Sequence, residues 1–69
     1  MGRKRLGRYL FVWWKGDHPP QHVHVFDNMG RFLGRMRVDT FEGLGGWQPS
    51  AQIVRLVQRL RQEGDLWQR

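Results

Sequence analysis

The sequence contains no cysteine, so it can form neither a disulfide nor a thiolate zinc site. It also lacks a long apolar run. The longest, Tyr9 to Trp14, is far shorter than the roughly 20 residues that cross a bilayer. Basic residues Arg3 to Arg5 precede this run, but it is too short for the core of a signal peptide and no small-residue cleavage site follows. We therefore expect a soluble, cytoplasmic protein with no membrane partner.

Acidic residues are few: six Asp and Glu stand against twelve Lys and Arg, giving a net charge of +6 over 69 residues. A basic domain attracts polyanions such as nucleic acid or an acidic protein. A charge of this size is also common in small domains simply because it favours solubility. A chain this short buries a small core, so a partner protein, a metal or a homo-oligomer is a further candidate source of stability.

Residues 1–8 hold four basic residues and two glycines. We expect a flexible basic arm here, followed by a single small α+β domain over residues 9–69. Such an arm can lie along a phosphate backbone, which makes Arg3, Lys4 and Arg5 candidate nucleic-acid-binding residues. The alternative is an ordinary solvated terminus.

Three segments have the composition of strands. Tyr9 to Trp14 is aromatic and β-branched, and His22 to Phe26 alternates histidine with valine. Residues 31–40 carry a third alternating pattern, after a turn rich in Asn and Gly. Because the links are short, the sequence predicts an antiparallel meander of three strands.

A helix is predicted over residues 49–63. Its apolar stripe, at i, i+3, i+4 and i+7, consists of Ile53, Leu56, Val57 and Leu60. Pro49 is tolerated in a first turn, and Gly64 is a plausible C-terminal cap. Packing one helix on one small sheet is the simplest way to bury such stripes, so we predict an α+β fold: a small three-stranded antiparallel sheet packed against one C-terminal helix.

Strand alternation also assigns side chains to the two faces of the sheet. The residues expected to face the helix are Val23, Val25, Phe32, Met36 and Val38. The residues expected on the opposite face are His22, His24, Phe26, Arg35 and Arg37. The histidines and two arginines should therefore share one face.

All three histidines lie between Asp17 and His24, in a stretch stiffened by two prolines. His22 and His24 are two residues apart on a predicted strand, so their Cα atoms should be about 7 Å apart on one face. That spacing suits two imidazoles on a divalent metal such as zinc, with His18 or Asp17 as a third ligand. This metal site, made of His18, His22 and His24, is one interpretation of the stretch.

The same stretch can act without metal. Asp17, His18, His22 and His24 are candidate catalytic residues, because a histidine moves protons near neutral pH. Metal-independent RNA cleavage also needs cations on the phosphate, which Arg35 and Arg37 could supply. A third interpretation makes the histidine segment a structural turn in a protein-interaction module. Whether the protein is an enzyme stays open.

Aromatic residues offer a binding surface as well, because exposed rings on a sheet stack nucleic-acid bases. The expected platform consists of Tyr9, Phe11, Trp13 and Phe26. The alternative is that these rings form the core, where aromatics of small domains are often found.

The motif D-H-P-P-Q-H-V-H-V, Asp17 to Val25, resembles the hallmark of a family of small bacterial proteins that carry a domain of unknown function. Members have an aromatic strand, D-H-P-P-x-H-x-H-V, a hairpin, a linker and a C-terminal helix, and this chain follows that order. They resemble small components of toxin–antitoxin-like gene pairs. The resemblance implies a small cognate partner protein and a nucleic-acid target, with Asp17, His18, His22 and His24 at the site.

Overall fold

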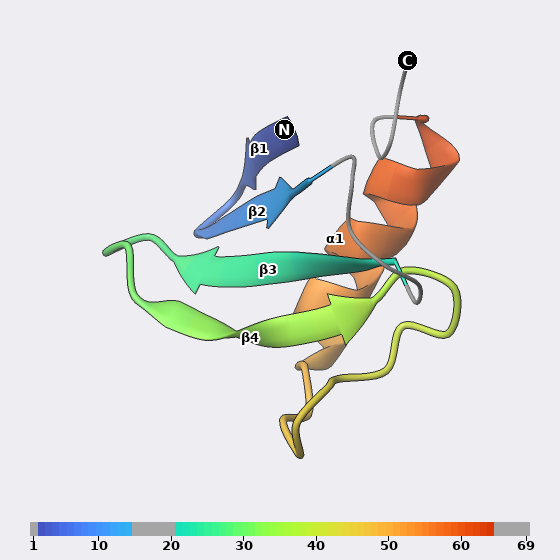
Figure 1. The fold of residues 1–69 in the computed structure, drawn as a ribbon. Helices are drawn as coiled ribbons and strands as arrows, with labels where there is room; N and C mark the ends of the chain where they lie inside the picture. The colour runs from blue at the N-terminus through green and yellow to red at the C-terminus, as the bar shows by residue number, and fades with distance from the viewer. Residues whose placement is uncertain (1, 15–20, 65–69) are drawn as a thin grey trace.

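The computed structural model describes residues 2–14 and 21–64. These residues form four strands and one helix, listed here in chain order: β1 (Gly2–Leu6), β2 (Tyr9–Trp13), β3 (His22–Asp27), β4 (Phe32–Arg37) and α1 (Ala51–Gln62). The strands pair in the order β1-β2-β3-β4, each antiparallel to the next, and α1 crosses one face of the sheet (Figure 1). The predicted α+β fold is confirmed, but the prediction of three strands is wrong because the sheet has four.

The additional strand, β1, comes from the segment expected to be a flexible basic arm. It pairs along its whole length with β2, from Gly2 opposite Trp13 to Leu6 opposite Tyr9. Gly7 makes the tight turn between the two strands, with a φ of 59° that glycine adopts without a steric penalty. Neither alternation nor β-branched residues mark β1 in the sequence. Its extended conformation follows from pairing with the strongly β-forming β2.

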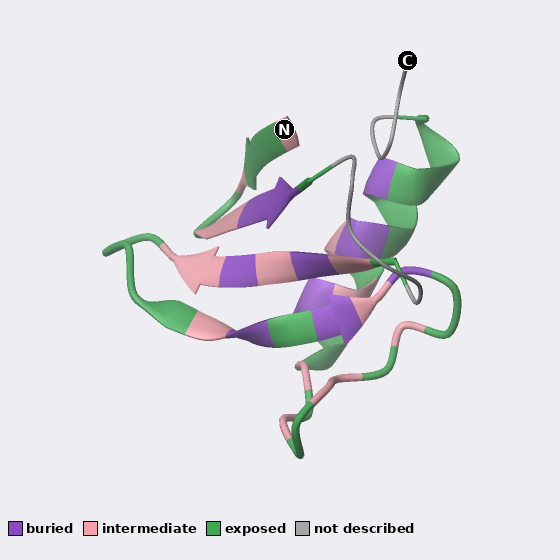
Figure 2. Ribbon diagram, viewed as in Figure 1, coloured by how far each residue is buried: buried purple, intermediate pink, exposed green. Residues whose placement is uncertain are grey.

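The core lies between the sheet and the helix. Its buried members are Phe11, Trp13, Val23, Val25, Met36, Val38, Ile53, Val57 and Leu60. Figure 2 shows the resulting alternation of buried and less buried residues along β3. Four of the five strand residues expected to face the helix belong to this core, and the exception is Phe32.

Phe32 leaves the core because the pairing of β3 with β4 is irregular. Val25 pairs with Gly34, whereas the next residue, Phe26, pairs with Phe32. Leu33 is therefore an extra residue in β4, and such a bulge reverses the alternation beyond it. Leu33 packs against the core in place of Phe32, whose side chain lies 54% exposed on the opposite face of the sheet.

The helix begins two residues later than predicted. Ser50 is its N-cap, and the Ser50 Oγ accepts a hydrogen bond from the backbone N–H of Ile53 at 3.3 Å. Pro49 therefore precedes the cap instead of lying in the first turn. Gly64, just beyond the C-cap, has a φ of 76°, so the predicted glycine terminator is confirmed. No helix within residues 2–14 and 21–64 is long and apolar enough to span a membrane.

The chain turns back after β4 and covers part of its outer edge. The backbone N–H of Arg37 donates to the carbonyl of Glu42 at 2.8 Å, and that of Leu44 donates to the carbonyl of Arg35 at 2.9 Å. The indole of Trp47 then packs on Gly34, where a Cβ atom would lie only 2.8 Å from its Cγ. The loop from β4 to α1 thus closes one edge of the sheet, while β1 forms the other edge.

Candidate nucleic-acid interface

The two faces of the sheet differ in character. In β3, Val23 and Val25 are fully buried against the helix side, whereas His22 and His24 are half-buried on the opposite side, as predicted. Residues directly opposite each other in antiparallel strands project to the same face. We use the term histidine face for the sheet face opposite α1, which carries His22, His24 and their cross-strand neighbours.

A contiguous row of rings crosses the histidine face. The Trp14 ring meets the His24 ring edge-on, with centroids 4.7 Å apart. The His24 and Phe32 centroids are 6.0 Å apart, and those of Phe32 and Phe26 are 5.5 Å apart. We call these four residues the aromatic row. Its two exposed members are Phe32, at 54%, and Trp14, at 39%.

The aromatic row differs from the platform expected from the sequence. Phe11 and Trp13 are buried in the core and Tyr9 packs against it, so only Phe26 of the expected set lies on the histidine face. Trp14 follows the buried Trp13, and strand alternation alone could have placed it on the opposite face. Phe32 could not have been found in that way, because the bulge at Leu33 changes its face.

A line of paired residues runs across all four strands and carries an arginine at each end. Arg3 on β1 is opposite Val12, Val12 is opposite His24, and His24 is opposite Arg35. Since three strand spacings separate the two arginines, their Cα atoms are about 14 Å apart. Arg5 also lies on this face, opposite Leu10, whereas Lys4 lies opposite the core residue Phe11.

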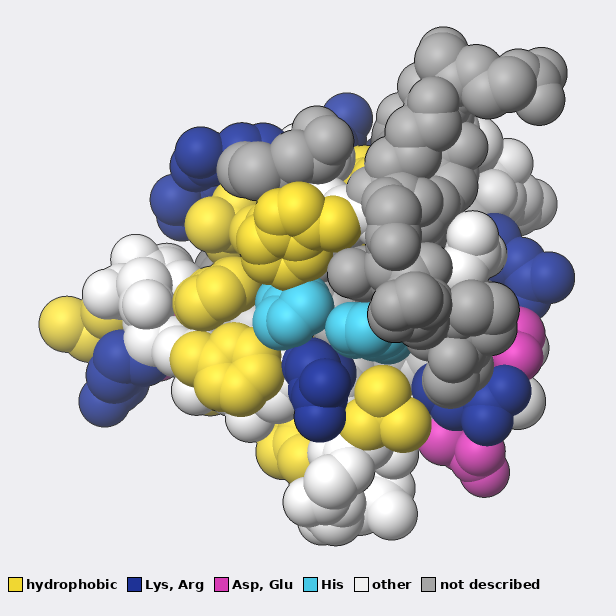
Figure 3. All heavy atoms as spheres, in the orientation of Figure 1, with side chains coloured by type: hydrophobic (Ala, Val, Ile, Leu, Met, Phe, Trp, Pro, Cys, Tyr) yellow, Lys and Arg dark blue, Asp and Glu magenta, His cyan; other side chains and the backbone are white. Residues whose placement is uncertain are grey.

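Both end arginines of this line are exposed, and Val12 between them is 7% exposed. Figure 3 shows the histidine face with the imidazoles among hydrophobic and cationic side chains. Acidic side chains in this view lie to one side of the imidazoles (Figure 3). The face therefore combines exposed rings with positive charge.

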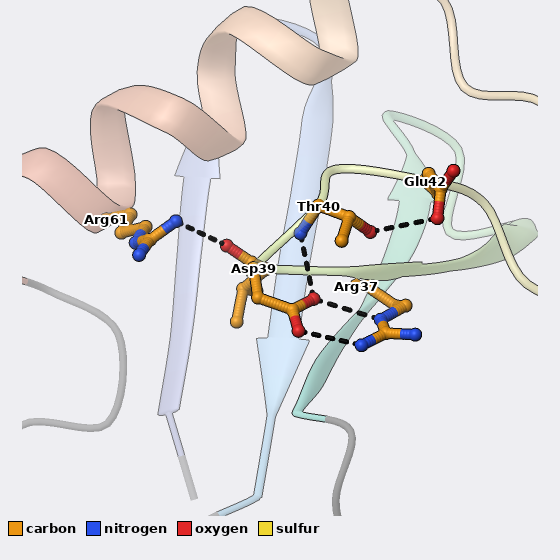
Figure 4. A network of polar contacts seen from close by, with 6 residues as sticks. Arg37, Asp39, Thr40, Glu42 and Arg61 are labelled. Carbon is orange, nitrogen blue, oxygen red and sulfur yellow. Dashed lines mark hydrogen bonds and ion pairs between the residues drawn. The ribbon is translucent and has the colours of Figure 1, made fainter.

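Arg37, the second arginine predicted on this face from β4, is engaged by an acidic residue. Its Nε donates to Asp39 Oδ1 at 2.9 Å and its Nη2 donates to Asp39 Oδ2 at 2.7 Å (Figure 4). This two-point contact, together with the N–H of Thr40, lowers the pKa of Asp39 to about 2, and it raises the pKa of Arg37. A phosphate at Arg37 would have to compete with Asp39 for the guanidinium group.

The turn that carries Asp39 is tied to the helix. Arg61 on α1 donates from Nη1 to the carbonyl of Val38 at 3.1 Å (Figure 4). Its guanidinium also lies 5.8 Å from the ring centroid of Phe41. Phe41 has a φ of 63°, which costs a non-glycine residue free energy and is tolerated here because the ring packs against the core. Thr40 and Glu42 add a side-chain hydrogen bond of 3.1 Å. These contacts hold the turn that carries Asp39 against the helix.

The predicted histidine site is described only in part. The His22 and His24 rings are neighbours, with centroids 5.1 Å apart, so the structure brings these two together. Asp17 and His18 lie outside the described residues. Within residues 2–14 and 21–64, no three His, Cys, Asp or Glu residues are grouped as metal ligands. A zinc site on His22 and His24 would therefore need further ligands from the remainder of the chain.

Comparison with known proteins adds no further assignment. No protein-family model matches the chain, and neither a curated protein nor a solved structure matches it. The family resemblance drawn from the D-H-P-P-x-H-x-H-V motif thus stays a prediction.

Proposed function

We propose that the protein is a small nucleic-acid-binding module, of the toxin-like kind that its histidine motif suggests, and that the histidine face is its binding surface. One observation carries the proposal. Exposed aromatic rings and three arginines, Arg3, Arg5 and Arg35, occupy the sheet face that α1 does not cover. Rings of this kind stack bases, and arginines bind phosphates.

The line of paired residues from Arg3 to Arg35 suits an extended polyanion. A strand that crosses the sheet along this line would meet a cation at either end and His24 between them. The Arg37 guanidinium, held by Asp39, adds little net charge. Binding should therefore depend mainly on the three other arginines of the face.

The test is the affinity of the full chain for fluorescently labelled RNA and DNA oligonucleotides, measured by anisotropy over a range of salt concentrations. Each phosphate contact contributes a slope of about −0.7 to −0.9 in log K against log salt. We expect Arg35→Gln to weaken binding and to reduce the slope by about one such contact. Arg55→Gln, which removes the same charge from an exposed position on α1, is the matched control and should change neither the affinity nor the slope appreciably.

Weak binding without a salt dependence would refute the proposal. Equal losses in Arg35→Gln and Arg55→Gln would refute the histidine face as the binding surface, because the two residues lie on elements packed on opposite sides of the core.

A second candidate function, a histidine-metal protein or hydrolase, is favoured by the adjacent rings of His22 and His24. Metal would be measured in the gently purified protein and in the His22→Ala, His24→Ala double variant. We expect a metal-binding protein to retain zinc that the double variant loses. Absence of metal from both proteins would refute the metal-binding function. Metal-independent hydrolysis of RNA would then be assayed with the same two proteins.

A third candidate, binding of a small cognate protein, is favoured by the edge strand β1. The outer edge of β4 is partly covered by the following loop, whereas β1 ends the sheet and presents Arg3, Lys4 and Arg5. A basic edge favours an acidic partner strand over a second copy of itself, because like charges on facing strands repel. An extended peptide of alternating Glu and Val should then bind to the edge of β1. A peptide of the same length with alternating Lys and Val should not.

A further inference from the structure

Phe32 occupies an unusual position for a large apolar side chain. Because of the bulge, Leu33 packs against the core instead of Phe32, and the Phe32 ring is 54% exposed. The exposed part of the ring gains nothing from burial, so packing in the core does not explain its position. Contacts with Phe26 and His24 nevertheless hold the ring on the histidine face.

Trp14 provides a second exposed ring on the other side of His24. The centroid of His24 is 4.7 Å from that of Trp14 and 6.0 Å from that of Phe32. The two exposed rings thus flank one half-buried imidazole. Arg35 lies directly opposite His24 on the neighbouring strand, so its guanidinium can reach the region between the two rings.

We propose that the histidine face selects single-stranded nucleic acid, with one unpaired base stacked on Phe32, a second base at Trp14, and Arg35 on the intervening phosphate. The inference rests on the proposed nucleic-acid function and specifies its substrate. In a duplex the bases are stacked on each other, and the deep, narrow major groove of RNA helices excludes protein side chains. A ring on a sheet face therefore stacks on an unpaired base without the cost of unstacking a duplex.

Recognition of this kind should be tolerant of sequence. Stacking uses the π-face that every base has, and no set of hydrogen-bonding side chains is needed to read base edges. Binding should instead depend strongly on the presence of bases. An oligonucleotide with abasic sites keeps its phosphates, and so it separates stacking from charge.

The experiment compares three labelled RNA probes of equal length by anisotropy with the full chain: a single strand, a duplex and a single strand carrying abasic sites. Single-stranded DNA serves as a fourth probe. We expect the single strands to bind at least about ten-fold more tightly than the duplex and the abasic strand, because stacking contributes about 1–3 kcal/mol per base, a factor of about 5 to 150. Preference for RNA over DNA would indicate an additional contact to the ribose 2′-hydroxyl.

Variants at Phe32 test the stacking position directly. Phe32→Leu keeps an apolar side chain but removes the π-face, and it should weaken single-strand binding about ten-fold. Phe32→Trp should retain binding, and both variants should leave duplex binding unchanged. The control is Met29→Ala, which removes a 75% exposed apolar side chain in the β3–β4 turn, outside the aromatic row, and should have no effect. Circular dichroism and thermal melting would verify that each variant is folded.

The two proposals fail in different ways. If duplex and abasic probes bind as tightly as the single strand, and Phe32→Leu has no effect while Arg35→Gln still weakens binding, the single-strand inference is overturned and the nucleic-acid proposal stands. If no probe binds with a salt dependence, the nucleic-acid proposal itself is overturned.

Discussion

Asp39 should limit how tightly the protein binds nucleic acid. Its carboxylate holds the Arg37 guanidinium through two hydrogen bonds, of 2.9 and 2.7 Å, beside the histidine face. The variant Asp39→Asn removes this charge but keeps a side-chain oxygen that can accept from the N–H of Thr40, as Asp39 Oδ1 does at 2.8 Å. Arg37, which lies opposite His22, would then lose the ion pair and the hydrogen bond from its Nη2, so a phosphate would compete for its guanidinium more easily.

The size of the gain follows from the number of phosphate contacts. If Arg3, Arg5 and Arg35 each meet one phosphate of a single strand, the slope of log K against log salt should be about −2.1, at about −0.7 per contact. Adding Arg37 should make it about −2.8. If the added contact contributes nothing at 1 M salt, this change raises the affinity about five-fold at 0.1 M salt. Asp39→Asn should thus bind more tightly than the unmodified protein.

The assay is an anisotropy titration with a labelled single-stranded RNA at several salt concentrations. Glu63→Gln is the matched control, because it likewise neutralises one carboxylate and releases one arginine: Arg59, bound at 2.9 Å on α1. We expect a steeper slope in Asp39→Asn alone. An unchanged slope in Asp39→Asn, or the same change in both variants, would refute the reasoning that nucleic acid passes beside Arg37.

Three further predictions concern stability. Gly34→Ala should lower the free energy of unfolding by about 1–3 kcal/mol, because the added methyl group collides with the Trp47 indole, and an unchanged urea midpoint would contradict this. Ser50→Ala should lower the free energy of unfolding by about 1 kcal/mol, because the N-cap hydrogen bond is lost. Urea unfolding measures this change, and an unchanged midpoint would show that the cap is dispensable. The Arg37 contact lowers the pKa of Asp39 from its ordinary 3.8 to about 2. The ionised Asp39 carboxylate therefore stabilises the folded protein fully above pH 3.8, and this contribution is lost as the pH falls to about 2. The difference in urea midpoint between the unmodified protein and Asp39→Asn should therefore shrink over that interval, and a constant difference would contradict it.

Much of the fold could be predicted from local patterns. The alternation of His and Val in β3 placed the histidines and valines on opposite faces, and the apolar stripe of α1 identified Ile53, Val57 and Leu60 as core residues. These patterns are reliable because each side chain's environment follows from strand or helix periodicity alone. Gly64 was likewise predictable, since few other residues adopt a positive φ at a helix end.

Other features depend on residues that are distant in sequence. β1 has the composition of a solvated arm and becomes a strand only by pairing with β2. The bulge at Leu33 is set by how β4 meets β3, so no periodicity within β4 reveals it, and the exposed ring of Phe32 was assigned to the core for that reason. Arg37 and Asp39 are two residues apart, so alternation places them on one face, but the two-point contact between them depends on the path of the turn after β4.

Some residues of the candidate site could likewise be predicted from the sequence, and others could not. The sequence identified His22, His24 and Arg35 as neighbours on one face, because all three follow strand alternation from well-paired positions. It did not identify Phe32 or Trp14, which give the face its exposed rings. The contributions of Asp17 and His18 stay predictions of the motif.

The most direct test of the central proposal is a titration of the ¹⁵N-labelled protein with single-stranded RNA, followed by amide chemical shifts. We predict that the largest changes occur on the histidine face, at His24, Phe32 and Arg35, and that the exposed side of α1 around Arg55 changes little. Changes concentrated on α1, with none on β3 and β4, would contradict the proposal that the histidine face binds nucleic acid.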